Sequence, residues 1–149
     1  MDFKESARQC FSGPGNCSQS VFSVFAKNLG LELDTALKVA SAFGGGMGRR
    51  QHTCGAVTGA LMAIGLRYGM GMEGEVARKE KTYQLAGQFM DEFTRRHGSL
   101  SCRDLLEGLS MTDPDDLRLI EEKGLFRTSC VSYVTDAVEI LESVFAENP

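Results

Sequence analysis

The sequence predicts an all-α protein, a compact multi-helix bundle built around one central helix of small residues. Long alternating runs of Val, Ile and Thr are nearly absent, whereas apolar residues recur at helical spacing along the chain. Gly55, Gly59 and Ala63 lie four residues apart and therefore form one stripe along a helix. Because this stripe carries almost no side chain, another backbone can approach it closely. We therefore expect this helix, from about Arg50 to Tyr68, to be packed on several sides.

Three helices are expected before the central one, each ended by a glycine. Their predicted ranges are residues 2–11, 17–29 and 35–43. Asp34 is a residue type that favours helix N-caps, so it is expected to cap the third. The run Gly44–Gly48 then separates the third helix from the central one.

Four further helices are expected after the central one. The longest spans residues 75–97; its apolar face begins with Val76 and Tyr83, and its basic last turn complements the helix dipole. Two short helices follow, the first capped by Ser101 and the second opened by Pro114 at its first position. The last helix is expected to be capped by Ser129.

Composition narrows the class of protein. The 149 residues are expected to form a single domain, 1–149, with the 42% hydrophobic and 24% charged residues of an ordinary globular chain. The net charge of −4 argues against a nucleic-acid-binding protein. No segment has the roughly 18 apolar residues of a membrane span, and the N-terminus lacks the apolar core of a signal peptide. We therefore expect a cytoplasmic protein without a membrane or nucleic-acid partner.

Five cysteines in a reducing compartment more often react, bind metal or lie buried than form structural disulfides. Four of them directly follow a residue type that favours helix N-caps, whereas Cys10 follows Gln9. A thiol in the first turn of a helix is close to free backbone N–H groups and to the positive end of the dipole, and both favour the thiolate. These four, called here the motif cysteines, are Cys17, Cys54, Cys102 and Cys130.

The spacing of the motif cysteines leaves several kinds of site open. No CxxC is present, and each cysteine lies on a different predicted helix, so the fold must assemble any shared site. Four thiolates meeting at one point would suit an iron–sulfur or a zinc site, whereas two pairs would suit reversible disulfides. The candidate reactive residues and the candidate metal ligands are therefore the same four side chains.

The order of these cysteines also carries a family resemblance. Cys17, then Cys54-Gly55-Ala56-Val57-Thr58-Gly59, then Cys102 and Cys130 resembles the redox-active family named for a C…GCAxxG…C…C pattern. Cys54-Gly55 stands where that pattern has Gly-Cys. The resemblance covers most of the chain and implies redox chemistry of the cysteines.

The glycine run before the central helix offers a second candidate site. Glycines followed by two arginines at a helix start could hold an anion or a phosphate, through Gly45, Gly46, Arg49 and Arg50. The run lacks the Lys-Ser/Thr of a P-loop and the strand that precedes one. The alternative is that the run ends a helix and lets two backbones cross closely. If it binds an anion, it would place an anionic substrate beside Cys54.

The leading functional hypothesis is a small redox protein whose motif cysteines act as one group. They would either hold an iron–sulfur cluster, or another thiolate-bound metal, for electron transfer, or cycle between dithiol and disulfide. The rival hypothesis is a non-catalytic interaction module or a subunit of a redox complex, with structural cysteines that either bind zinc or do not. The sequence leaves open whether the protein is an enzyme. Its redox partner is unknown, and no particular residue specifies a homodimer.

Overall fold

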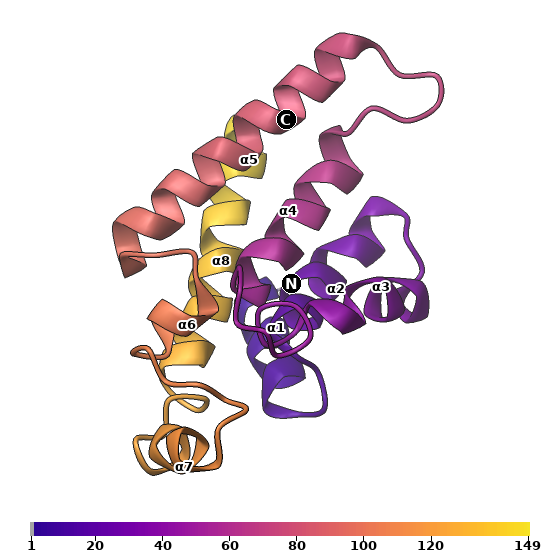
Figure 1. Cartoon of the computed structure of the whole chain (residues 1–149). Coiled ribbons are helices and arrows are strands. Elements are labelled where there is room, and N and C mark those ends of the chain that lie inside the picture. The colour runs from indigo at the N-terminus through magenta and orange to yellow at the C-terminus, as the bar shows by residue number, and fades with distance from the viewer. Residues whose placement is uncertain (1) are drawn as a thin grey trace.

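A computed structural model of the chain describes residues 2–149, and these residues form eight α-helices and two short 3-10 helices (Figure 1). The α-helices are α1 (Phe3–Ser12), α2 (Cys17–Ala26), α3 (Leu33–Ala40), α4 (Gly55–Tyr68), α5 (Val76–His97), α6 (Cys102–Leu105), α7 (Pro114–Glu122) and α8 (Ser129–Glu147). The 3-10 helices η1 (Lys27–Leu29) and η2 (Ser41–Phe43) extend α2 and α3. Within residues 2–149, the only β pairing is one isolated bridge between Thr53 and Ser101. The predicted all-α class is confirmed.

Helix α4 is central, as the stripe of small residues predicts. It packs against α2, α5 and α8. A Cβ atom added to Gly59 would lie 2.6 Å from the backbone oxygen of Ser18 in α2, and one added to Gly55 would lie 2.9 Å from the Cβ of Cys17. The two helices cross at a distance that only glycine allows at these two positions.

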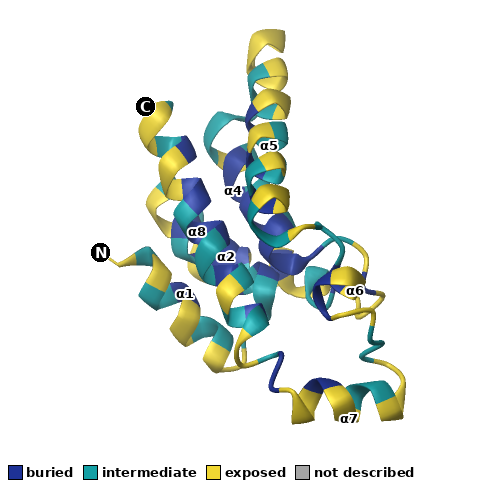
Figure 2. Cartoon of the chain, turned by 90° about the vertical axis from the view of Figure 1, so that its left-hand side faces the viewer, coloured by how far each residue is buried: buried dark blue, intermediate teal, exposed yellow. Residues whose placement is uncertain are grey.

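The long helix α5 is buried only along part of its length. Leu85, Phe89 and Phe93 belong to the main core. Val76 and Tyr83, by contrast, are 67% and 63% exposed, so the prediction that they begin the apolar face is wrong. The reason is that the first part of α5 extends beyond the ends of its neighbours (Figure 2). Neither α5 nor any other helix in residues 2–149 combines the length and apolar character needed to cross a membrane.

Two helix starts differ from the predictions. Helix α4 begins at Gly55 rather than near Arg50, because the preceding residues form a left-handed turn and then pair with the segment before α6. In that pairing the N–H of Cys54 donates to the backbone oxygen of Leu100 at 2.8 Å. Helix α3 begins at Leu33 after Glu32, so Asp34 lies in its first turn and is not the N-cap.

A second, smaller hydrophobic cluster lies beside the main core. It contains Cys102, Leu106, Ile120, Leu125 and Cys130, all buried. The segment from α6 to the start of α8 supplies it, and α7 lies apart from the other helices at one end of the molecule (Figures 1 and 2). Two of the motif cysteines therefore belong to this cluster, where it borders the rest of the fold.

Candidate functional site

The four motif cysteines line one cavity of about 920 Å³, called here the thiol cavity. Each comes from a different helix start: Cys17 is the first residue of α2, Cys54 directly precedes α4, Cys102 is the first residue of α6, and Cys130 is the second residue of α8. Segments up to 113 residues apart in the sequence therefore meet here (17 to 130). Cys10 is not among the lining residues.

The motif cysteines are close enough to influence one another electrostatically. In each of their six pairings, the negative charge of one thiolate raises the pKa of the other thiol. All five cysteines are nevertheless free thiols. Within residues 2–149, no three His, Cys, Asp or Glu side chains are close enough together to hold one metal ion. The sulfur atoms thus surround a volume and do not converge on a point.

Burial is the largest influence on these thiols. It raises the pKa of Cys102 and Cys130 to about 12, and it raises the pKa of Cys17 well above its usual value. Backbone N–H groups of Ala56 and Val57 at the start of α4 lower the pKa of Cys54, but burial outweighs them. The expectation that these helix starts favour the thiolate is therefore wrong, because the pKa of every motif cysteine is raised. At these sites, desolvation is stronger than the hydrogen bonds and the dipole.

Two of the four expected helix caps are present. Asn16 forms a capping box with Gln19: the N–H of Gln19 donates to the Asn16 side chain at 2.9 Å, and the N–H of Asn16 donates to the Gln19 side chain at 3.0 Å. Ser101 caps α6. Thr53 instead lies in the β-bridge, and Ser129 is already helical, so neither caps the helix that follows.

A left-handed turn forms one wall of the thiol cavity. Five consecutive residues, Gly45 to Arg49, have φ between 60° and 69°, a region that side-chain-bearing residues rarely adopt. Three glycines make this path inexpensive. A Cβ atom on Gly46 would lie 2.7 Å from the Cβ of Cys102, so the turn presses its backbone directly against a motif cysteine. The density of glycine was visible in the sequence; the handedness of the turn was not.

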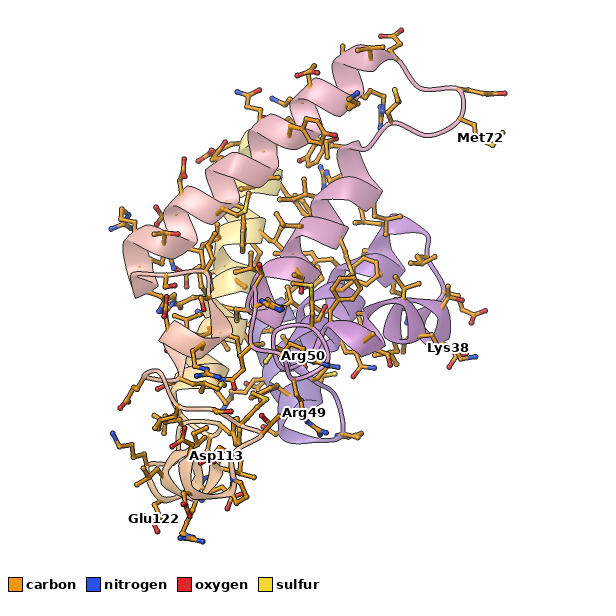
Figure 3. The ribbon with its side chains drawn as sticks, viewed as in Figure 1. Lys38, Arg49, Arg50, Met72, Asp113 and Glu122 are labelled. Atoms are coloured by element: carbon orange, nitrogen blue, oxygen red, sulfur yellow. The ribbon has the colours of Figure 1, made fainter. Side chains whose placement is uncertain are left out.

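The four residues expected to contact an anion are only partly brought together. Gly45, Gly46 and Arg49 line the thiol cavity, together with the four thiols, whereas Arg50 does not. Figure 3 labels both arginines on the turn. His52, two residues before Cys54, is exposed and does not line the cavity.

Gln51 is a structurally important residue that the sequence reasoning missed. Its side-chain amide N–H donates to the backbone oxygen of Leu109 at 2.8 Å, and its side-chain oxygen accepts from the N–H of Met111 at 2.8 Å. The residue is only 5% exposed and has φ of 57°. Gln51 thereby fastens the turn to the segment between α6 and α7. No periodicity or motif marks this role.

The remaining walls are mostly apolar. They come mainly from the segment between α6 and α8 and include Leu105, Leu106, Met111, Leu117 and Phe126. Tyr133 of α8 also lines the cavity, and its hydroxyl donates to the backbone oxygen of Leu105 at 2.7 Å. No acidic side chain in residues 2–149 lines the cavity, and Arg49 is its single charged one.

Comparisons with known proteins give a family model and a relative that each match most of the chain. A family model described as "Putative redox-active protein (C_GCAxxG_C_C)" matches residues 15–144, a range that contains all four motif cysteines. A relative from Archaeoglobus fulgidus, called an uncharacterized protein, is 32% identical over 133 residues, covering 84% of this chain and 81% of that one. No solved structure matches the chain.

The structure also explains the inverted Cys54-Gly55 pair. Position 55 faces α2, where an added Cβ atom would lie 2.9 Å from the Cβ of Cys17 and 3.0 Å from the nitrogen of Ser18. Positions 54 and 55 both line the cavity, but a side chain at position 55 would collide with α2. In this chain the thiol therefore occupies the position that has room for it, and glycine occupies the crossing.

Proposed function

The chain belongs to the C_GCAxxG_C_C family of redox-active proteins, and we propose that its four motif cysteines hold an iron–sulfur cluster for electron transfer. The observation that carries the proposal is the arrangement of Cys17, Cys54, Cys102 and Cys130 around one cavity. Four cysteine thiolates are the usual ligand set of such clusters, which supply one-electron chemistry when bound.

The spacing of the thiols favours a cluster over a single ion. Around one zinc ion, with Zn–S bonds of about 2.3 Å, tetrahedral ligand sulfurs lie about 3.8 Å apart. No three candidate ligands in residues 2–149 are grouped closely enough to hold one ion, yet all six thiol pairs interact. A cluster of several atoms can reach thiols that lie too far apart to bind one ion.

The raised pKa values favour ligation over dithiol–disulfide cycling. A nucleophilic thiol needs a lowered pKa, because the thiolate is the attacking form. Burial instead raises the pKa of each motif cysteine, and to about 12 for Cys102 and Cys130. Buried thiols without a cation stay protonated, whereas a bound metal deprotonates a coordinating thiol outright. The site thus suits thiols that ionise only when they bind metal.

The rest of the cavity supplies what a cluster site needs from a protein. Apolar walls such as Leu106 and Phe126 limit water, and solvent exposure is one of the factors that set a cluster potential. The glycine turn brings backbone to Cys102 at a distance that no side chain would permit. Arg49 adds one positive charge beside a group of four thiolates.

Serine substitutions test the ligand set. The chain is purified without oxygen, and the charge-transfer absorption in the visible range is recorded for Cys17→Ser, Cys54→Ser, Cys102→Ser and Cys130→Ser. We expect each to lose most of the absorption and iron, and Cys10→Ser, the control outside the cavity, to keep both. Equal absorption in all five variants would refute the proposal. Metal-free wild-type protein whose count of free thiols cycles reversibly from five to three, or from five to one, would instead establish disulfide chemistry.

A further inference from the structure

We propose that the mouth of the thiol cavity is an anion subsite, in which Arg49 and the backbone of Gly45 and Gly46 bind the oxyanion group of a small substrate. The proposal deepens the proposed function, because it rests on redox chemistry in the same cavity and names the charge of the molecule that shares it. The occupant it predicts carries a carboxylate or a phosphate.

Apart from the motif cysteines, the charge on the cavity walls favours an anion. Arg49 is the single charged side chain on its walls, and no Asp or Glu within residues 2–149 lines it. Arg49 is exposed at the edge of the cavity, and none of the ion pairs within residues 2–149 includes it. Its neighbour Arg50 is equally close in sequence but does not line the cavity. A guanidinium with free donors matches the geometry of a carboxylate or a phosphate.

The backbone of the turn adds donors at the same place. From Met47 onward, the N–H groups of the turn donate to backbone oxygens within the chain. The N–H groups of Gly45 and Gly46 make no such hydrogen bond in the described chain, and both residues line the cavity. Like the first N–H groups of any helical turn, they remain available to an acceptor. Arg49 follows one turn later.

The conformation of Arg49 points to the same role. Its φ of 61° lies in the left-handed region, where a non-glycine residue costs on the order of 1 kcal/mol. Glycine would adopt this conformation without strain. An arginine at such a position is consistent with a function that needs its side chain.

The cavity has room for a cluster and a substrate together. If each of eight heavy atoms occupies the ~30 Å³ of a water molecule, a compact cluster fills roughly 240 Å³. The cavity measures about 920 Å³. Apolar side chains such as Leu117 and Phe126 line the remaining space, so they would contact the uncharged part of the substrate.

The test compares two alkylating reagents that differ in charge. Iodoacetate is an anion and iodoacetamide is neutral, and both are attacked only by the thiolate. The thiolate fraction, which the pKa of each thiol sets, therefore cancels in the ratio of the two alkylation rates. The reduced, chelator-treated full chain is alkylated with each reagent after its helix content is checked by circular dichroism. Mass spectrometry of the peptides gives the ratio at every motif cysteine, with Cys10 as an internal reference outside the cavity.

Two neighbouring arginines provide the matched variants. We expect Arg49→Gln to lower the iodoacetate preference of the cavity thiols about fivefold, the effect of one unit charge at about 4 Å in water. Arg50→Gln should leave it unchanged. Arg49→Gly also removes the charge, but it relieves the strain of the left-handed backbone and so should not destabilise the turn. A fall in the ratio that both Arg49 variants share is therefore caused by loss of the charge and not by unfolding. An unchanged ratio in both Arg49 variants, or an equal fall in Arg50→Gln, would overturn the proposal.

Protection experiments identify the anion. Inorganic phosphate and acetate are each added to the iodoacetamide reaction, and we expect one of them to slow alkylation in the wild type but not in Arg49→Gln. If neither protects, no oxyanion binds here. If chelation unfolds the chain, the loaded protein is oxidised with ferricyanide and with hexaammineruthenium(III), and Arg49→Gln should slow only the anionic oxidant. Iron content reports on the cluster independently of all these ratios.

Discussion

The substitution Gly59→Ala tests the close crossing of α2 and α4, on which the relative positions of Cys17 and Cys54 depend. An alanine Cβ at this position would lie 2.6 Å from the backbone oxygen of Ser18, which is 0.8 Å short of the 3.4 Å where ordinary contact begins (3.4 − 2.6). The atom it meets is backbone, so no side-chain rotation relieves the overlap. The two helices must separate instead.

The expected cost follows from two opposing effects. Forcing an extra methyl into a packed interface costs about 1–3 kcal/mol. Alanine in place of glycine stabilises a helix interior by about 1 kcal/mol. We therefore expect Gly59→Ala to lower the free energy of unfolding by up to about 2 kcal/mol, which corresponds to a fall in Tm of up to about 6 °C for a chain of this size.

Gly65→Ala on the same helix is the matched control. A Cβ atom there would meet nothing within 4 Å, so only the helix-propensity effect remains. We expect it to stabilise the protein by about 0.5–1 kcal/mol. Urea denaturation followed by circular dichroism at 222 nm measures both variants. The reasoning is refuted if Gly59→Ala is as stable as Gly65→Ala, because the crossing would then tolerate a methyl group.

Three further outcomes follow from the site. In the metal-free protein, the free energy of unfolding should fall as pH rises from about 9 toward 12, because burial raises the pKa of Cys102 and Cys130 to about 12 and the folded chain then binds more protons than the unfolded one. Urea denaturation of the chelator-treated chain at pH 8 and pH 10 measures this, and replacing both cysteines by serine should flatten the dependence. Gln51→Ala should cost about 1–3 kcal/mol by leaving the partly buried backbone groups of Leu109 and Met111 without these partners, whereas His52→Ala next to it should change stability by less than about 0.5 kcal/mol. Tyr133→Phe removes one hydrogen bond to the cavity wall and should cost about 1 kcal/mol without loss of bound iron; a loss of iron would show that the hydroxyl matters for the site itself.

Local signals were sufficient for most of the helices. The capping pair of Asn16 and Gln19, the cap of Asp113 with Pro114, and the glycine that ends α5 at position 98 all act within one turn of the chain. Such signals depend on neighbouring residues alone and therefore can be recognised in one sequence. The central place of α4 was predictable for a related reason, since a stripe of glycine has few other uses in a helix.

The errors concern residues whose structure depends on distant partners. The start of α4 shifted by five residues, from Arg50 to Gly55, because Thr53 pairs with Ser101 across the chain. Val76 is exposed because α5 extends beyond its neighbours, a fact of helix length and tertiary packing. Helical periodicity carries no information on pairing with a distant segment or on where neighbouring helices end.

For the cysteines, the position in the chain was predictable from the sequence, whereas the direction of the pKa shifts was not. Their position at helix starts was predicted from the residues before them, although only Asn16 and Ser101 act as caps, and the four cysteines line one cavity. The direction of their pKa shifts was not predictable, because burial depends on tertiary packing; Cys102 and Cys130, for example, are buried in the cluster formed by the segment from α6 to the start of α8. Gln51, which fastens that segment, makes both of its side-chain bonds to residues about 60 positions away.

Metal and sulfide analysis of protein purified without oxygen tests the central claim most directly. The four cysteines around one cavity predict iron with an equal amount of acid-labile sulfide, visible absorption that bleaches on reduction, and loss of both in the motif-cysteine variants. Zinc without sulfide, or colourless protein that stays metal-free after anaerobic incubation with iron and sulfide, would contradict it.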